Sequence, residues 1–303
     1  MRKLTVLSAM RPTGRLHLGH YFGTLQKWVE LQKESECYYM SADWHALTTD
    51  YGDTSRINAN TLEMIADWIT VGIDPNKSTL FKQSKVPQHS ELFLVLSMIT
   101  PLGWLFRCPT YKEQKSEVKS KDLNNYGFLG YPVLQSADIL LYKADIVPVG
   151  EDQLSHLEFT RELARRFNSF YGCRVFVDPK EGLTKVTRVL GLDGRKMSKS
   201  YDNSILIGES DDVLNYKIKN MFTDPIKIKK YDIGHPGNCV VFAFHKIFND
   251  DCKKKEEKCK AGEIGCTLCK KQLMEILSEF MKPLTEKRHD LISDKAYLEK
   301  IIK

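Results

Sequence analysis

Segments typical of buried strands alternate with helical segments through roughly the first 180 residues, and this alternation restricts the possible fold more than any other feature of the chain. The strand candidates are residues 4–8, 37–42, 80–83, 145–149 and 174–177. Helical patterns lie between them, at about residues 19–33, 55–71, 90–105, 133–143 and 152–168. Strands and helices that alternate in this way form a parallel sheet, because each helix returns the chain across it. We therefore expect an α/β fold with a doubly wound parallel sheet.

The sequence pattern of the chain changes after Ser200. Strand signals fade, and Lys- and Glu-rich helical segments dominate from about residue 210. A chain of 303 residues, 42% of them hydrophobic, is long enough for two domains. We expect a first domain, which contains the sheet, over residues 1–204 and a helical domain over residues 205–303.

The composition also bears on location and partners. The chain contains no apolar run of the roughly 20 residues that a membrane-spanning helix needs. The N-terminal segment lacks the apolar core and cleavage site of a signal peptide, so we expect a cytoplasmic protein without membrane contact. The net charge of +6 is compatible with a nucleic-acid partner.

The first strand candidate leads into a helix through the sequence RPTGRLHLGH, residues 11–20. This order of strand, turn and helix directs backbone N–H groups and the positive end of a helix toward an anion. His17 and His20 can donate hydrogen bonds to phosphate oxygens. Gly19 has no Cβ, so a flat adenine could lie against its backbone. Taken singly, each histidine could equally cap or pack the helix.

A second candidate phosphate site is the sequence GLDGRKMSKS, residues 191–200. The glycines predict a mobile loop, and Lys196 and Lys199 are point charges that could close over a polyphosphate. A basic pentapeptide alone is more often a solvated surface. The two segments occurring in this order make the phosphate interpretation the better one.

Together, HLGH and KMSKS resemble the two signature motifs of class I aminoacyl-tRNA synthetases. Residues 41–48, 131–142 and 150–161 are similar to bacterial-type tryptophanyl-tRNA synthetases, and the likeness runs from Leu4 to about Leu273. The resemblance implies ATP-dependent activation of L-tryptophan, transfer to the cognate tRNA, Mg²⁺ bound with ATP, and a homodimer. It also implies that residues 1–204, KMSKS included, form a catalytic domain with a Rossmann-like nucleotide-binding sheet, and that the helical domain binds the anticodon.

Residues 131–142 form an apolar helical pattern that carries one acid, Asp138. Tyr131, Gln135 and Asp138 share a helix face. Spacing alone favours a structural Asp paired with an Arg or a backbone N–H. The resemblance implies instead that Asp138 accepts the indole N–H, which is only a donor.

The resemblance also assigns roles to further residues. Three positions depart from the family pattern: Arg11 stands where many members have Gln, Gln135 where some have Met, and Ala9 in place of a pocket Gly. The implied catalytic residues are His17, His20, Lys196 and Lys199. The implied ATP-binding residues are Arg11, Gly19, His20, Lys112, Gly150, Asp152, Gln153, Lys196, Ser198 and Lys199, and those for tryptophan are Leu7, Ala9, His45, Tyr131, Gln135, Asp138 and Gln153.

Five of the eight cysteines fall between residues 239 and 269. In a cytosolic chain such clustering indicates a metal site before it indicates disulfides. Cys239, Cys259, Cys266 and Cys269 could hold a zinc ion or a four-iron, four-sulfur cluster, or remain free thiols. The arrangement resembles a subgroup of bacterial tryptophanyl-tRNA synthetases that carries the iron–sulfur cluster. Cys252 could take the place of Cys239.

Three other functions remain open from the sequence. A tyrosyl-tRNA synthetase has the same fold and reaction but a pocket for a phenol. A small nucleotidyltransferase of this fold is generally shorter and lacks the helical domain. A regulatory paralogue would bind tryptophan or RNA without catalysis, although the intact motifs argue against it.

Overall fold

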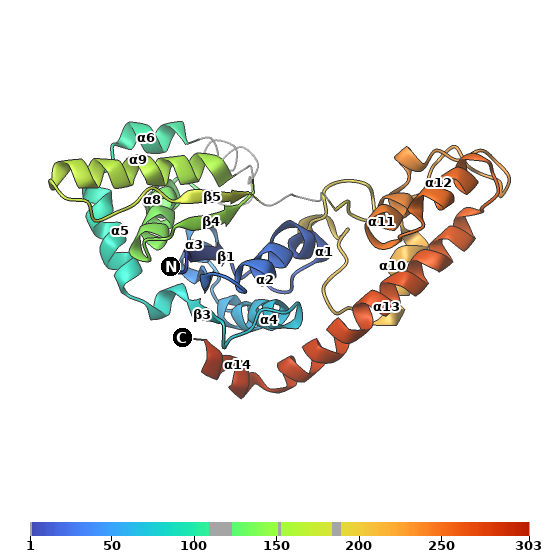
Figure 1. The fold of residues 1–303 in the computed structure, drawn as a ribbon, viewed down its shortest axis with the longest axis horizontal. Coiled ribbons are helices and arrows are strands. Elements are labelled where there is room, and N and C mark those ends of the chain that lie inside the picture. The colour runs from blue at the N-terminus through green and yellow to red at the C-terminus, as the bar shows by residue number, and fades with distance from the viewer. Residues whose placement is uncertain (1, 109–122, 151–152, 184–188, 303) are drawn as a thin grey trace. The chain divides into compact units, whose positions relative to one another are not determined.

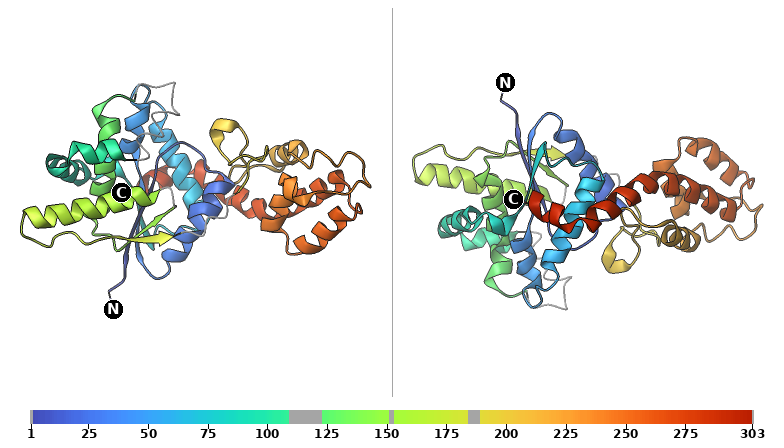
Figure 2. Two further views of the ribbon diagram at one scale, coloured as in Figure 1. Left: turned by 90° about the horizontal axis from the view of Figure 1, so that it is seen from above. Right: turned by 90° about the horizontal axis from the view of Figure 1, so that it is seen from below.

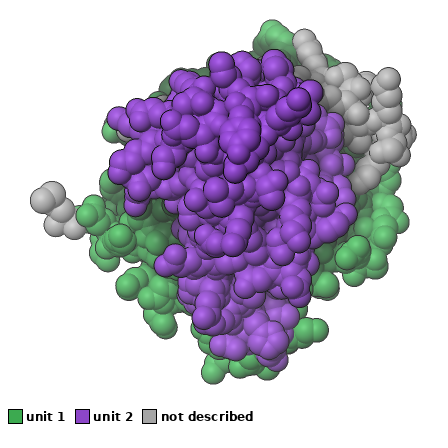
Figure 3. Space-filling model, turned by 90° about the vertical axis from the view of Figure 1, so that its right-hand side faces the viewer, with its two compact units in different colours: residues 1–14, 24–185, 294–303 green, residues 15–23, 186–293 purple. Residues whose placement is uncertain are grey.

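The computed structural model describes residues 2–108, 123–150, 153–183 and 189–302. Its chain divides into two compact units, which Figure 3 distinguishes by colour. The first unit comprises residues 1–14, 24–185 and 294–303, and the second comprises residues 15–23 and 186–293. Both HLGH and KMSKS therefore belong to the second unit, so the units do not follow the expected boundary at residues 204 and 205. The functional division of the chain at that boundary stays a prediction.

The first unit is built on a five-stranded sheet with the order β3-β2-β1-β4-β5 (Figure 1). All neighbouring strands are parallel, which confirms the expected α/β class. The winding reverses between β1 and β4, because β2 and β3 lie on one side of β1 and β4 lies on the other. Ligands of doubly wound sheets bind beyond the carboxyl ends of the strands at such a reversal. The strands are β1 (Thr5–Met10), β2 (Glu36–Ser41), β3 (Ser78–Lys82), β4 (Ile146–Val149) and β5 (Lys180–Leu183).

The strand expected at residues 174–177 is wrong, since β5 begins at Lys180 instead. The Asn168 side chain accepts hydrogen bonds from the backbone N–H groups of Val175 and Phe176 and donates to the carbonyl of Phe176. These backbone groups are therefore bonded to a side chain rather than to a neighbouring strand. Only Phe176 of this segment is buried, whereas Val175 and Val177 are exposed, so apolar composition alone misidentified it as a strand.

The helices of the first unit enclose apolar clusters that position its polar residues. One cluster joins β1, β2, β3 and β4 through buried residues that include Leu7, Met40, Phe81 and Val147. A second cluster packs α8 against α5 and α9. The helices are α2 (Gln26–Leu31), α3 (Asp43–Asp50), α4 (Ile57–Thr70), α5 (Gln88–Ile99), α6 (Leu102–Arg107), α8 (Tyr126–Leu141), α9 (Leu154–Phe170) and α14 (Lys295–Ile301).

The end of the chain returns to the first unit, as Figures 1 and 2 allow the reader to follow. Helix α14 packs against α4. Lys85 Nζ donates to the carbonyl of Ile302 at 3.1 Å. Residues 294–303, expected in the helical domain, thus complete the unit that contains the sheet.

The second unit is helical and has its own core. This core joins Leu18 of HLGH and Met197 of KMSKS to apolar residues of α10, α11 and α13. The two sequence motifs are therefore parts of one packed body. Its helices are α1 (Leu18–His20), α10 (Asp211–Asn220), α11 (Val240–Phe248), α12 (Cys252–Lys260) and α13 (Cys266–Ser293), and a π-helical turn (Tyr21–Leu25) follows α1.

None of the helices in the described ranges combines the length and the apolar character that crossing a membrane requires.

Candidate active site

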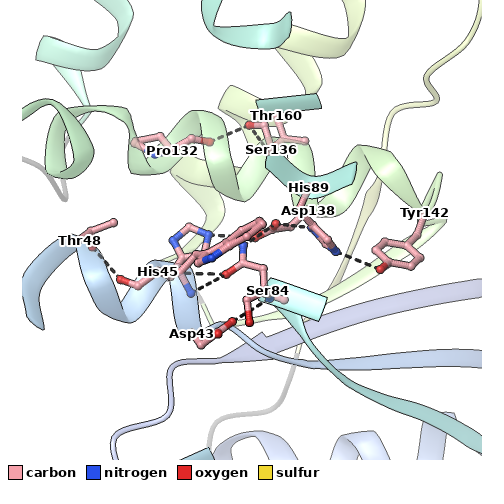
Figure 4. Close-up of polar contacts among 12 residues, drawn as sticks. Asp43, His45, Thr48, Ser84, His89, Pro132, Ser136, Asp138, Tyr142 and Thr160 are labelled. Atoms are coloured by element: carbon pink, nitrogen blue, oxygen red, sulfur yellow. Dashed lines mark hydrogen bonds and ion pairs between the residues drawn. The ribbon is translucent and has the colours of Figure 1, made fainter. Parts of the chain in front are cut away.

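Asp138 lies at the centre of a buried polar network in the first unit. Figure 4 shows contacts that run from His45 through Asp138 and His89 to Tyr142. His45 Nε2 donates to Asp138 Oδ2 at 2.9 Å, and His89 Nδ1 donates to Oδ1 at 2.7 Å. Gln83 Nε2 also donates to Oδ1, at 2.8 Å. The carboxylate thus receives three side chains, one from α3, one from the turn after β3 and one from α5.

The network determines the charge of Asp138, whose side chain is almost completely buried. Burial alone would raise the pKa of this carboxyl, but hydrogen bonds from His45 and His89 outweigh it and lower the pKa below its usual range. Asp138 is therefore ionised at neutral pH and acts as an acceptor. A buried carboxylate of this kind can bind a neutral N–H donor.

Tyr131, another polar residue of α8, contacts α9. Its hydroxyl lies 3.1 Å from His156 Nε2, and Cys108 Sγ lies 3.7 Å from His156 Nδ1. Tyr131 also borders a cavity of about 500 Å³ with mostly apolar walls. None of the other residues predicted to bind tryptophan lines this cavity, which is bordered by Trp44, Leu47, Thr48, Tyr51, Phe93, Asn125, Gly127, Gly130, Tyr131 and Leu134.

His17 and His20 lie side by side in the second unit, with ring centroids 3.9 Å apart. The backbone N–H of His17 donates to His20 Nδ1 at 3.2 Å. Burial and the charges of Lys199 and Lys196 lower the pKa of His17 to about 4. Burial, His17 and the same lysines lower the pKa of His20 to about 3. Both rings are neutral at pH 7, so positive charge at this site comes from the lysines.

Gly19 is required by close packing. A Cβ at this position would lie 2.8 Å from Cε1 and 2.9 Å from Nδ1 of His17. Any side chain here would therefore displace the His17 ring. The ring is itself buried, which leaves it little room to move.

The lysine loop is attached to the HLGH segment by backbone contacts. Leu18 N donates to the carbonyl of Ile205 and Ile207 N donates to that of Leu16, both at 2.9 Å. Lys199 Nζ donates to the carbonyl of Arg15 at 3.0 Å. The ammonium group of Lys199 thus lies within the same small region as the two histidines.

Asn203 organises the loop, although sequence reasoning did not select it. Its Oδ1 accepts from Ser198 N at 2.8 Å, and its Nδ2 donates to Asp193 Oδ1 at 2.8 Å and to the carbonyl of Lys196 at 3.2 Å. A Cβ at Gly191 would lie 2.1 Å from Asn203 Nδ2, so only glycine admits this side chain. The sequence signal that could have identified Asn203 is its position five residues after Ser198.

Comparison with known proteins gives the family. The family model described as "tRNA synthetases class I (W and Y)" matches residues 1–282. The chain belongs to this family. It is 47% identical over 303 residues to the tryptophan–tRNA ligase of Thermotoga maritima, covering 99% of this chain and 92% of the relative. It is 42% identical to the tryptophan–tRNA ligase of Aquifex aeolicus, covering 95% and 91%.

A solved structure agrees with the sequence relatives. The tryptophanyl-tRNA synthetase of Campylobacter jejuni, complexed with ADP and tryptophan, superimposes with a TM-score of 0.89. It is 35% identical and covers 99% of this chain and 92% of that chain. The expected resemblance to bacterial tryptophanyl-tRNA synthetases is confirmed, and the chain is an aminoacyl-tRNA ligase.

The predicted site residues fall into two groups. His17, Gly19, His20, Lys196, Ser198 and Lys199 gather in the second unit. Arg11 follows β1 of the first unit and contacts Thr49 and Asp50 of α3. Leu7 of β1 is buried in an apolar cluster and Ala9 is exposed near the end of the same strand. The other three, Gln135, Gly150 and Gln153, are half-buried. Lys112 and Asp152 lie outside the described residues.

The four predicted metal ligands, Cys239, Cys259, Cys266 and Cys269, line one small pocket together with Asp224 and Lys227. Cys252 does not line it. Their present arrangement is not that of a ligand set: within the described ranges, no group of three or more His, Cys, Asp or Glu side chains is placed to hold a metal ion. Burial raises the pKa of Cys269 to about 12, so its thiol is protonated at neutral pH.

Three residues around Asp138 were not selected from the sequence. Gln83 follows β3, His89 begins α5 and Tyr142 follows α8. A polar residue at the carboxyl end of a strand is a usable signal for Gln83. His89 gave no such signal, because a single His on a mostly apolar helix is usually structural.

Proposed function

We propose that the protein activates L-tryptophan with ATP and transfers the tryptophanyl group to tRNA(Trp). The choice of tryptophan as the amino acid rests on Asp138, whose carboxylate is ionised and buried and accepts hydrogen bonds on both oxygens. An indole N–H is a donor only, so it suits an acceptor that the protein keeps charged. The names of the bacterial relatives support the same substrate.

The chemistry requires no protein nucleophile. The tryptophan carboxylate attacks the α-phosphorus of ATP, and pyrophosphate leaves. A hydroxyl at the 3′ end of the tRNA then attacks the carbonyl carbon of the adenylate, and AMP leaves. Catalysis comes from positioning and from stabilising the developing charge. His17 and His20 donate N–H groups to phosphate oxygens as neutral rings.

Lys196 and Lys199 supply the positive charge for the leaving pyrophosphate. In the structure Lys199 donates to the carbonyl of Arg15, so it must exchange this contact for a phosphate oxygen. Ser198, whose backbone is fixed by Asn203, holds the loop between the lysines. Mg²⁺ bound to ATP would share the phosphate charge, and such an ion would need no dedicated protein cage.

The remaining binding roles follow the residues that the sequence indicated. The further residues that bind ATP are Arg11, Gly19, Lys112, Gly150, Asp152 and Gln153. Those that surround tryptophan are Leu7, Ala9, His45, Tyr131, Gln135 and Gln153. Tyrosine is the competing substrate, because the family includes enzymes for both amino acids. A phenol would need a donor as well as an acceptor, and His45 and His89 already direct their N–H groups to Asp138.

ATP–pyrophosphate exchange tests the proposal. Exchange should depend on tryptophan and should not occur with tyrosine at equal concentration. In the variant Asp138→Asn the amide can turn a donor toward the indole, and we expect a loss of at least about 2 kcal/mol in tryptophan binding. Exchange supported by tyrosine, or by an amino acid other than tryptophan, would reject the proposed substrate.

The cysteine pocket is proposed to hold a metal centre with a structural role. Four thiols line one pocket and, once drawn together, would supply the ligands of a zinc ion or of a four-iron, four-sulfur cluster, and the iron–sulfur cluster is our first choice. Binding would draw the thiols closer together and release their protons. The pocket joins the start of α11, the end of α12 and the first turn of α13, so the centre would fasten three helices.

A homodimer in the cytoplasm is also proposed. Helices α5 and α6 expose large apolar side chains, among them Leu94, Met98, Leu102 and Phe106. Met98 is 73% exposed, which is unusual for a side chain that gains nothing from water. A second copy of this chain, packing the same helices, would cover them. Cytoplasmic location follows from tRNA as the substrate.

A further inference from the structure

The two oxygens of Asp138 differ in their partners. Oδ1 accepts from His89 Nδ1 at 2.7 Å and from Gln83 Nε2 at 2.8 Å. Oδ2 accepts from His45 Nε2 at 2.9 Å. A carboxylate oxygen has two lone-pair sites, so the donors of Oδ1 occupy both of them. Oδ2 has acceptor capacity left for a ligand.

The donors of Oδ1 are themselves fixed. Gln83 is completely buried, and its Oε1 accepts from the backbone N–H groups of Trp44 and His45 at 3.1 and 3.3 Å. These two bonds orient the amide so that its NH₂ group faces Asp138. His89 is also completely buried, so solvent supplies no alternative partner for its ring.

The ring of His89 must be in one particular tautomer. An ionised carboxylate only accepts, so Nδ1 of His89 carries the proton. In a neutral ring Nε2 is then an acceptor, and the hydroxyl of Tyr142 lies 3.0 Å from it. Tyr142 therefore donates to Nε2 and stabilises the tautomer that bonds Asp138. Figure 4 shows this sequence of contacts.

We infer that His89 and Tyr142 are positioning residues for amino-acid selection: Tyr142 sets the tautomer of His89, and His89 with Gln83 holds Oδ1 so that Oδ2 is presented to the indole N–H. This inference rests on the proposed function, in which Asp138 accepts that N–H. Neither His89 nor Tyr142 needs to contact the amino acid.

The packing of the Tyr142 ring can be tested separately from the hydrogen bond of its hydroxyl. Its ring packs against Tyr38 and Phe81, with centroids 4.9 and 5.5 Å away. Tyr142→Phe keeps these ring contacts and removes only the donor to His89. Tyr38→Phe is the matched control, because the Tyr38 hydroxyl donates to Glu36 on the surface and has no bond to His89.

The measurement compares tryptophan with an analogue in which sulfur replaces the indole N–H. Equilibrium binding of both ligands is measured on the full-length protein. In Tyr142→Phe we expect about tenfold weaker binding of tryptophan and unchanged binding of the sulfur analogue. Tyr38→Phe should bind both ligands as the wild type does.

A second pair of variants tests His89. His89→Asn retains an N–H at the position of Nδ1, whereas His89→Leu removes the donor and leaves Asp138 with one fewer partner. The Asn variant should preserve most of the preference for tryptophan over the sulfur analogue, and the Leu variant should lose about tenfold of it. Thermal unfolding of each variant separates this effect from misfolding.

Two results would overturn the inference: equal losses for both ligands in Tyr142→Phe and His89→Leu, or no loss for either. Asp138→Asn distinguishes this failure from failure of the proposed function. If Asp138→Asn also leaves the preference for tryptophan unchanged, Asp138 is not the indole acceptor. If it abolishes the preference while the other variants do not, only the positioning role of His89 and Tyr142 is rejected.

Discussion

Individual side chains in the second unit show how charge and neutrality are divided at the proposed phosphate site. The histidines of HLGH are buried and have low pKa values, while Lys196 and Lys199 provide cations. The lysine charges themselves help to keep the rings neutral. Protonated histidines would bind phosphate more strongly before the reaction, whereas neutral donors combined with a movable lysine loop can favour the transition state.

Replacing Lys199 with Ala should slow adenylate formation far more than it weakens tryptophan binding. Loss of one preorganised charge contact of this type costs about 3 kcal/mol, or roughly a hundredfold or more in rate. Single-turnover kinetics measure this rate of adenylate formation. Lys282→Ala, an exposed lysine on α13, is the control. An unchanged activation rate in Lys199→Ala would contradict the role of the loop.

Gly19→Ala tests the packing of the HLGH segment. The added methyl group must displace the ring of His17, since the contact would be under 3 Å. We expect the activation rate to fall at least about tenfold, because positioning of the donor is lost. Gly23→Ala is the control, as a Cβ there meets no atom within 4 Å. Equal rates in the two variants would show that His17 tolerates the shift.

At the scale of elements, helix ends carry most of the functional groups. Helix α3 begins directly after β2 and presents His45, and the turn after β3 presents Gln83. Helix α8 carries Asp138 among apolar neighbours, where α5 supplies His89. In the second unit, the ends of α11, α12 and α13 bring the cysteines to one pocket.

The cysteine pocket gives an element-scale prediction. Protein purified without oxygen should be brown, with visible absorbance that air or a chelator bleaches. Cys266→Ser should lower the melting temperature, since it removes a ligand that fastens α13. Cys252→Ser is the matched control, because Cys252 does not line the pocket. A colourless preparation with one zinc per chain would assign zinc, and a preparation without metal would leave free thiols.

The exposed surface of α5 gives a second prediction at this scale. Met98→Glu should weaken self-association at least tenfold, because a carboxylate would be buried without a partner. Sedimentation equilibrium measures the change. Val177→Glu places the same charge at another exposed apolar position of the first unit. A dimer of unchanged stability in Met98→Glu would exclude this face from the interface.

At the scale of the whole molecule, the stability of the second unit is expected to depend on pH. Burial, and then the charge of Lys255, lowers the pKa of His245 to about 4, as burial and the neighbouring lysines do for His17. In the unfolded chain the pKa of each of these histidines is 6.5, the ordinary value for this side chain. Between these values the unfolded chain binds more protons, so the free energy of unfolding falls as the pH is lowered.

Thermal unfolding measured at about pH 7 and about pH 4.5 checks this dependence. These two pH values cover most of the range between the pKa of about 4 in the folded protein and the pKa of 6.5 in the unfolded chain. His245→Gln retains a donor for the carbonyl of Cys269 but does not titrate. It should reduce the loss of stability on acidification, whereas His289→Gln, at an exposed position, should not. A wild-type protein equally stable at both pH values would contradict the prediction.

The sequence by itself determined the α/β fold, the helical C-terminal region and the family. These properties depend on local patterns: strand and helix periodicity, HLGH and KMSKS. It also selected Asp138 and the four cysteines, although spacing alone favoured a structural role for the acid. Tertiary structure decided which side chains bond Asp138, where the fifth strand lies, and that residues 294–303 complete the first unit. Hydrogen-bond partners and strand pairing are set by segments far apart in the chain, so they become definite only when those segments pack together.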